Sequence, residues 1–227
     1  MTLPPPESQA AAPRGNPESE PVLIARQSES EETQVYRAGA YRLLAALLRS
    51  PPDAVVLDQV ANLAGVDSET DQLSAALSAL GQAVRESGAG AIDEEFHTLF
   101  IGLGRGELMP YGSWYLTGFL MEKPLGVLRD DLVRLGYERN EGIHEPEDHI
   151  AALCEVMSMM IAETLDQPSR EGGEGLQEQF FQAHIGTWVE RFFRDLSESQ
   201  SAIFYRSVGC FGLAFAQFEQ RYFSMNA

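Results

Sequence analysis

A run of side chains able to bind metal occupies residues 144–149 of this chain of 227 residues. Every residue in it except the proline has a ligand-type side chain, in the order His144, Glu145, Pro146, Glu147, Asp148, His149. His144 precedes the proline and His149 follows it, so the two imidazoles do not share one helical face. Three interpretations stay open: a metal site, a helix cap with a core histidine, or a site that binds another molecule.

A second candidate group surrounds a turn that begins at Pro110. Its aromatic members are Tyr111, Trp114 and Tyr115, and Ser113 stands among them. Serine often caps a helix, so we expect Ser113 to begin one. Aromatic side chains beside a turn often line grooves, but they also pack in cores, and the sequence leaves both roles open.

No catalytic or cofactor-binding motif accompanies these groups. The chain has no phosphate-binding G-x-x-x-x-G-K-[ST] loop, no G-x-G-x-x-G after a strand and no H-E-x-x-H. The glycines of residues 102–106 follow an expected helix, so they indicate a flexible turn rather than a phosphate cradle. The two cysteines lie too far apart in sequence to suggest a zinc pair. We therefore predict a protein that is not an enzyme and has no cofactor.

The charge of the chain limits its partners. Thirty-four acidic residues against 16 basic ones give a formal net charge of -18. A surface this acidic repels phosphate backbones, so nucleic acid is excluded as a partner and basic partners are favoured.

The compartment is expected to be the cytoplasm. The first residues show neither the basic start nor the apolar block of a secretory signal, and no stretch reads as a membrane span. Cys154 and Cys210 fall within apolar helical patterns, where free thiols fit a reducing compartment and act as small core residues.

Apolar residues recur three and four apart along most of the chain, so the elements that must position these groups are helices. The prolines and polar residues of 1–28 predict a disordered tail. Residues 29–227 are expected to form a single all-α domain of about nine helices. They should run over about 31–49, 53–65, 68–88, 95–102, from 113, 124–135, from 146, 181–196 and 204–222.

Caps and breaks give these helices their expected bounds. Asp53 should cap the second, Ser68 and Asp71 sit at capping-box spacing, and Gly136 should supply a left-handed stop. Residues 146–148 are expected to form the first turn of a long helix, where acids favour the positive end of the helix dipole. On that helix His149 would face the interior, and Asp148 would point toward the helix mouth.

The order of several blocks resembles the TorD/DmsD/NarJ family of chaperones. A Glu-aromatic-x-x-Leu-Phe helix core is followed by Pro-Tyr-x-Ser-x-Tyr, Met-x-x-Pro and a block ending in Asp-His. Phe-x-x-His-x-x-x-Trp and Phe-Tyr then follow. These blocks are residues 95–100, 110–115, 121–124, 146–149, 181–188 and 204–205, within a similarity that covers about 33–223. Glu147 separates Pro146 from Asp148, where many family members have the proline directly before the aspartate.

The resemblance implies an all-helical, non-catalytic, cytoplasmic chaperone. Such a protein binds the twin-arginine signal region and the apo-precursor of a molybdenum-cofactor oxidoreductase, and it assists cofactor insertion and export proofreading. The client could be a formate dehydrogenase, a dimethyl sulfoxide or trimethylamine N-oxide reductase, or a nitrate reductase. The protein is expected to be a monomer or dimer without stable membrane insertion.

The resemblance also selects the residues expected to bind the signal peptide or client. They are Tyr111, Ser113, Trp114, Tyr115, Glu147, Asp148 and His149. Two alternatives remain: a metal- or nucleotide-dependent enzyme centred on residues 144–149, and a general protein–protein adaptor.

Overall fold

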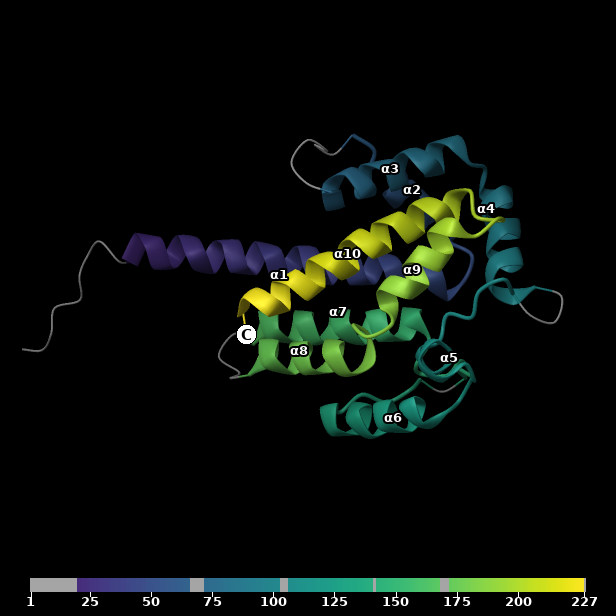
Figure 1. The fold of residues 1–227 in the computed structure, drawn as a ribbon. Coiled ribbons are helices and arrows are strands. Elements are labelled where there is room, and N and C mark those ends of the chain that lie inside the picture. Colours follow the sequence, from purple (N-terminus) through teal and green to yellow (C-terminus); the bar gives the residue numbers. More distant parts are fainter. Residues whose placement is uncertain (1–19, 66–71, 103–105, 141, 168–171, 227) are drawn as a thin grey trace, which may run out of the picture.

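Helices account for almost all regular structure in the computed structural model, which describes residues 20–65, 72–102, 106–140, 142–167 and 172–226. The all-α prediction is confirmed (Figure 1). The elements are α1 (Glu20–Arg49), α2 (Ala54–Ala61), α3 (Gln72–Glu86), α4 (Ala89–Phe96), the π-helical turn η1 (His97–Ile101), α5 (Gly112–Thr117), α6 (Lys123–Leu135), α7 (Ile150–Asp166), α8 (Gly173–His184), α9 (Val189–Glu198) and α10 (Phe204–Asn226).

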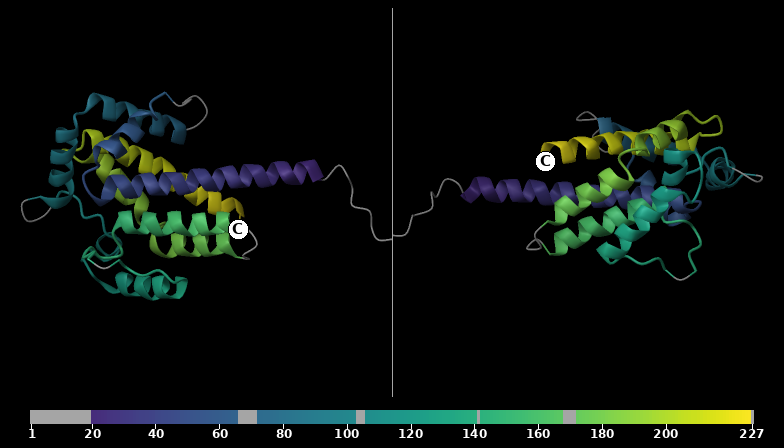
Figure 2. Two further views of the ribbon diagram at one scale, coloured as in Figure 1. Left: turned by 180° about the vertical axis from the view of Figure 1, so that it is seen from behind. Right: turned by 60° about the horizontal axis from the view of Figure 1, so that its bottom comes forward.

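The core forms where α1, α7 and α10 meet their neighbours. Helix α1 packs along α7, and α10 packs on α9 and α3. Leu47, Met157 and Phe211, from α1, α7 and α10, are completely buried. The N-terminal part of α1 extends beyond the other helices in every view (Figures 1 and 2). In Figure 1, α5 lies toward the side away from this extension, and α6 lies along the bottom of the molecule, below α8.

A buried polar network joins α1 to α10 and α8. The guanidinium of Arg37 donates to both carboxylate oxygens of Glu219 at 2.6 and 2.8 Å, and both residues are completely buried. The Tyr41 hydroxyl donates to the same carboxylate, and the Oε1 atoms of Gln34 and Gln177 accept from Arg37. Burial by itself would lower the pKa of Arg37, but Glu219 raises it overall, so this residue stays charged.

Several expected helix boundaries are confirmed. Helix α1 ends at Arg49, directly before the Ser-Pro-Pro sequence of residues 50–52. The Asp53 side chain caps α2 by accepting from the Val56 amide at 2.9 Å. Gly136 ends α6 with a φ of 84°. The proposed Ser68–Asp71 capping box lies outside the described residues.

Other boundaries differ from the expectation. Helix α1 begins at Glu20, so it reaches into the predicted tail of residues 1–28, most of which lies outside the described residues. The expected helix over 181–196 is two helices, α8 and α9, separated by residues 185–188. At this break Gly186 lies so close to the Phe181 ring that a Cβ atom would be 2.9 Å from it. The tail-and-domain boundary at residue 29 stays a prediction.

Glu95, from the first family-like block, has a structural role. Its carboxylate accepts from the backbone amides of Ile203, Phe204 and Tyr205, at 2.8, 3.0 and 2.7 Å. These amides lie at the beginning of α10, where a helix leaves its first N–H groups without internal partners. Glu95 therefore caps α10 from a distant part of the sequence.

One cysteine and one histidine of two pairs are buried, and the other member of each pair is exposed. Cys154 is buried in the core as expected, whereas Cys210 is exposed on α10, so its prediction as a core residue was wrong. Neither forms a disulfide. His184 is buried at a core edge, but His97 is exposed on η1. Among the described residues, no helix is long and apolar enough to cross a membrane.

Candidate functional site

Two segments far apart in sequence meet at the candidate site. Tyr111 and His149 form an isolated antiparallel β-bridge. The Gly112 amide donates to the Asp148 carbonyl and the Ile150 amide donates to the Pro110 carbonyl, each at 2.9 Å. The turn before α5 and the turn before α7 therefore form one backbone unit. It brings together four of the residues that the sequence selected, namely Tyr111, Ser113, Asp148 and His149.

Asp148 caps α5 rather than α7, the helix that follows it in sequence. Its Oδ2 accepts from the Ser113 amide at 2.7 Å, while the side chain is only 4% exposed. The expected Ser113 cap is wrong, because α5 begins at Gly112 and the Ser113 hydroxyl instead accepts from the Met121 amide. Among the described residues, no donor reaches the second carboxylate oxygen of Asp148, Oδ1.

His149 caps α7. The helix begins at Ile150, so residues 146–148 precede it and the expectation that they form its first turn is wrong. The Ala151 amide donates to Nδ1 of His149 at 3.1 Å, which places the ring hydrogen of the neutral imidazole on Nε2. Burial lowers the pKa of His149 to about 4, against an opposing effect of Glu145. The side chain is thus neutral at pH 7, and its ring packs edge-on against Tyr111.

The remaining carboxylates of the cluster point to other partners. Glu147 accepts from Arg129 at 2.8 Å and lies 3.8 Å from Arg139. Burial alone would raise the pKa of Glu147, but these arginines lower it overall. Glu145 accepts from the Tyr111 hydroxyl, while burial raises the pKa of Tyr111 and Glu145 raises it further. Because these side chains diverge, the described residues contain no group of three or more His, Cys, Asp or Glu arranged for a metal ion.

A cleft of about 490 Å³ opens beside the cluster, between the end of α6, the 137–149 loop and one face of α7. We call it the main cleft. Its apolar lining comes from Leu132, Tyr137, Ile143, Ala151, Ala152, Val156 and Met159. Its charged and polar lining comes from Arg49, Glu138, Arg139, Asn140, His144, Glu145, Glu147, His149 and Glu155. Arg49 pairs with Glu155, and Arg139 lies near Glu147, so acids are in excess around this apolar floor.

A second, smaller cavity of about 190 Å³ lies on the side of Asp148. We call it the α5–α6 groove. It is lined by Gly112, Ser113, Leu116, Pro124, Val127, Leu128, Asp148, Ala183 and His184. His184 lies 2.7 Å from Asp131 and its pKa is lowered, mainly by burial. Although Asp148 and His149 are neighbours in sequence, Asp148 lines the groove and His149 lines the main cleft.

The other two aromatic candidates lie on α5 outside both cavities. Tyr115 stacks on Trp188 with ring centroids 5.5 Å apart, and its hydroxyl donates to Asp195 at 3.0 Å. Arg191 lies over the Tyr115 ring and donates to its carbonyl. Tyr115 thus joins α5 to α9. Trp114 is half-buried on α5.

Sequence reasoning missed most of the cleft and groove walls. Ile143, Val156 and Met159 were not among the residues that the sequence selected, and neither were Val127 and His184. What marks these walls in the structure is the exposure of apolar residues on helices: Met159 is 43% exposed and Val127 is 49% exposed. Exposure of a helical face depends on which neighbours cover it, so this signal appears only in the fold.

Comparisons with known proteins agree on one family. The family model described as "Nitrate reductase delta subunit" matches residues 63–194, which include the two turns of the candidate site. The chaperone protein TorD of Vibrio atlanticus is 27% identical over 68% of this chain and 76% of its own. TorD of Aliivibrio salmonicida is 28% identical over 71% of this chain and 78% of its own. A putative redox enzyme maturation protein from Archaeoglobus fulgidus has a similar fold. Its TM-score is 0.50 at 21% identity, covering 81% of this chain and 93% of that one.

Proposed function

The chain belongs to the family described as nitrate reductase delta subunit, and within it to the TorD-like maturation chaperones, and from this premise we propose a specific role. The protein is a cytoplasmic chaperone for one molybdenum-cofactor oxidoreductase. It binds the twin-arginine signal region and the apo-precursor of that enzyme, so that export waits until the cofactor is inserted. Its named relatives are chaperones and a maturation protein rather than enzymes, in agreement with the prediction that it is not an enzyme.

The observation that carries this proposal is the composition of the main cleft. An apolar floor that includes Ile143, Val156 and Met159 is bordered by Glu138 and Glu145. A peptide with basic residues ahead of an apolar segment has the matching chemistry. Its apolar side chains would cover the floor, and its basic residues would approach the acidic border.

The sizes of the free-energy contributions indicate which part of the peptide supplies most of the affinity. A pair between an arginine and an exposed acid contributes roughly 0.2–1 kcal/mol. Burial of several hundred Å² of apolar peptide surface contributes roughly 25 cal/mol per Å² before the cost of ordering the peptide. The apolar segment therefore supplies most of the affinity, and the exposed acids orient the peptide.

The enzymatic alternative has no specific observation in its favour. His144 is exposed in the 137–149 loop, whereas His149 is buried and uses Nδ1 to cap α7. The two imidazoles thus have separate structural surroundings. The adaptor alternative differs from the proposed function in its ligand, because a general adaptor would not distinguish a twin-arginine peptide from a scrambled one.

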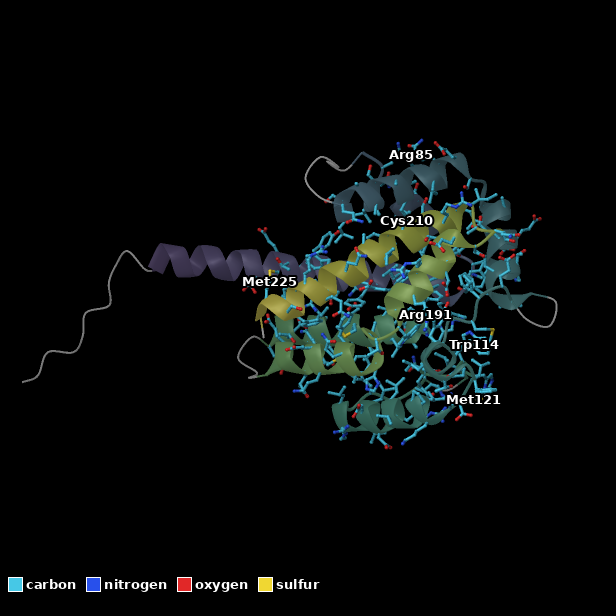
Figure 3. All side chains as sticks on the ribbon, in the orientation of Figure 1. Arg85, Trp114, Met121, Arg191, Cys210 and Met225 are labelled. Carbon is cyan, nitrogen blue, oxygen red and sulfur yellow. The ribbon has the colours of Figure 1, made fainter. Side chains whose placement is uncertain are left out.

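Titration calorimetry with a peptide of two adjacent arginines followed by an apolar segment tests the proposal. Met159→Gln should weaken binding by at least several-fold, because Met159 lies in the cleft floor. Met225→Gln is the matched control, because this exposed methionine lies at the far end of α10 (Figure 3). A peptide whose apolar segment is replaced by serines should not bind. Equal binding of a scrambled peptide, or equal effects of the two methionine variants, would refute the proposal.

A further inference from the structure

The turn between α5 and α6 places large apolar side chains in solvent. Phe119 and Met121 are 68% and 70% exposed, and Leu116 and Leu120 beside them are exposed as well. Across the α5–α6 groove from Leu116, Val127 of α6 is also exposed. We call these five residues the turn patch. An exposed apolar patch of this kind usually marks a surface that another molecule covers.

The backbone of this turn is fixed, so the patch is already formed in the free protein. The Ser113 hydroxyl accepts from the Met121 amide, and the Thr117 hydroxyl accepts from the Phe119 amide, each at 3.2 Å. Met121 has a φ of 57°, and within the described ranges it is the only residue other than glycine with a positive φ. Such strain persists only where surrounding contacts impose it, and it often accompanies a functional contact.

A hole of matching size lies directly beside the turn. The α5–α6 groove has a volume of about 190 Å³, and its lining includes Leu116 and Pro124, which flank the turn on either side. A cavity of roughly 150 Å³ is enough to hold a benzene ring. A projecting phenyl ring, that of Phe119, thus lies next to a groove that fits one. Two copies related by a twofold axis can each insert this ring into the groove of the other.

The charge of this face favours a second copy of the chain as the partner. Residues 112–135 contain three acidic and three basic residues: Glu122, Asp130 and Asp131, and Lys123, Arg129 and Arg134. Their formal charges cancel, whereas the whole chain carries -18. Two copies of so acidic a protein repel one another across most faces, but not across a neutral one. An anionic lipid surface, in contrast, would repel the whole molecule.

We propose that the chain forms a reversible dimer through the turn patch, with Phe119 of each copy in the α5–α6 groove of the other. The patch exposes on the order of 500 Å², below the roughly 800 Å² per partner of a standard interface, so the dimer is weak. The groove uses the beginning of α6 and the main cleft uses its end. The dimer therefore does not depend on the peptide site of the proposed function.

Sedimentation equilibrium of the full chain tests the dimer over a range of about 1 to 100 μM. The dimer fraction should rise with concentration. Phe119→Glu should raise the dimer dissociation constant at least tenfold, because it removes the ring and adds a charge to the groove. Met225→Glu is the matched control, because it adds the same charge at an exposed residue of α10, and it should dimerise like the wild type. Circular dichroism checks that both variants are folded.

A charge exchange at the turn tests the twofold geometry. Glu122 and Lys123 are adjacent, so a twofold axis at the turn can set each against the opposite charge of the other copy. Glu122→Lys and Lys123→Glu should each weaken the dimer several-fold, because like charges then meet. An equal mixture of the two variants should restore association, because opposite charges face each other again. A mixture no stronger than the single variants would refute this arrangement.

The salt dependence and the remaining outcomes complete the test. Raising the salt from about 0.05 to 0.5 M should strengthen the wild-type dimer, because it screens the repulsion between two acidic copies. A monomer at every concentration, or a dimer that Phe119→Glu leaves unchanged, would refute the proposal. A monomer that floats with anionic phospholipid vesicles, but not as Phe119→Glu, would show that a lipid surface covers the patch instead. These results leave the proposed function untouched, because peptide binding is measured separately.

Discussion

Asp148 and His149 show how two adjacent side chains can serve separate places. In extended backbone, successive side chains point in opposite directions, and these residues belong to the short bridge with Tyr111. Asp148 thus reaches the beginning of α5, and His149 reaches the beginning of α7. Each caps a helix and each lines a different cavity. If the proposed function holds, substitutions at these positions should affect both stability and peptide binding, and the choice of replacement decides which effect is measured.

At Asp148, alanine and asparagine should give different stabilities. Asp148→Ala leaves the buried Ser113 amide without an acceptor, so we expect a loss of about 1–3 kcal/mol in the free energy of unfolding. Asp148→Asn retains an acceptor and should lose less than half of that. Urea unfolding followed by circular dichroism measures both. Equal stability of the alanine variant and the wild type would contradict the assigned cap.

His149 should make the protein less stable in mild acid. Its pKa is lowered to about 4 in the folded protein, against about 6.5 in the unfolded chain. Between these values the unfolded chain binds the proton, so stability falls as the pH is lowered from about 6.5 and levels off near 4. The shift corresponds to a loss on the order of 3 kcal/mol.

A His149→Asn variant isolates this contribution. Asparagine is a good helix cap and does not titrate, so the variant keeps a cap on α7. Urea unfolding of both proteins between pH 4 and 8 should give a shallower pH dependence for the variant. Parallel curves would show that His149 does not titrate in this way.

At the scale of elements, α1 is held to the rest of the molecule by charge as well as by apolar packing. Arg37 from α1 and Glu219 from α10 form a completely buried pair, and Arg37 also lies over the Tyr222 ring. A buried pair adds little net stability compared with apolar residues, but the loss of one partner leaves an uncompensated charge. The network therefore makes the position of α1 against α10 specific.

Glu219→Ala should lower the free energy of unfolding by about 3–5 kcal/mol, because it leaves the buried Arg37 guanidinium without its carboxylate. Glu155→Ala is the matched control, because it removes a half-exposed pair with Arg49 and should cost less than about 1 kcal/mol. Chemical unfolding compares the two. Similar losses for both would mean that the buried pair is hydrated or replaceable.

At the scale of the whole molecule, the net charge of -18 should affect the association rate of a basic peptide more than its affinity. The field of an acidic protein speeds the encounter with a basic peptide, and salt screens it within about 10 Å at 0.1 M. Salt has much less effect on the free energy that apolar burial in the main cleft would contribute.

Stopped-flow and calorimetry at several salt concentrations test whether charge sets the association rate while apolar burial sets the affinity. The association rate of the twin-arginine peptide should fall severalfold between 0.05 and about 0.5 M salt, while most of the binding free energy is retained. A neutral apolar peptide is the control and should show no such dependence. Complete loss of binding in moderate salt would point to recognition by the acidic surface alone.

The N-terminal segment should be dispensable up to residue 28. Removing residues 1–28 should leave the melting temperature and peptide binding unchanged, because the buried part of α1 includes Gln34 and Arg37, which stay in place. Removing residues 1–37 deletes the partner of Glu219 and should lower the melting temperature by many degrees. Thermal unfolding of the two truncated proteins checks this. A large drop for the shorter truncation would show that the segment packs on the domain.

The sequence by itself determined the helical class and several local boundaries. Periodicity of three and four residues specifies a helix because it reflects the turn of the helix itself, and caps such as Asp53 and stops such as Gly136 act within a few residues. The order of short blocks, from Glu95 to Tyr205, was enough to indicate the family. These features need no knowledge of distant contacts.

The tertiary structure alone decided which side chains act together. Glu95 caps a helix more than a hundred residues away, and Asp148 caps α5 rather than α7, because a cap depends on which amides lie within reach in space. The α5–α6 groove exists because α8 ends beside α5 and α6 and brings His184 to the same cavity as Val127. Local spacing carries no information about such contacts, since the distances involved are set by packing between helices far apart in sequence.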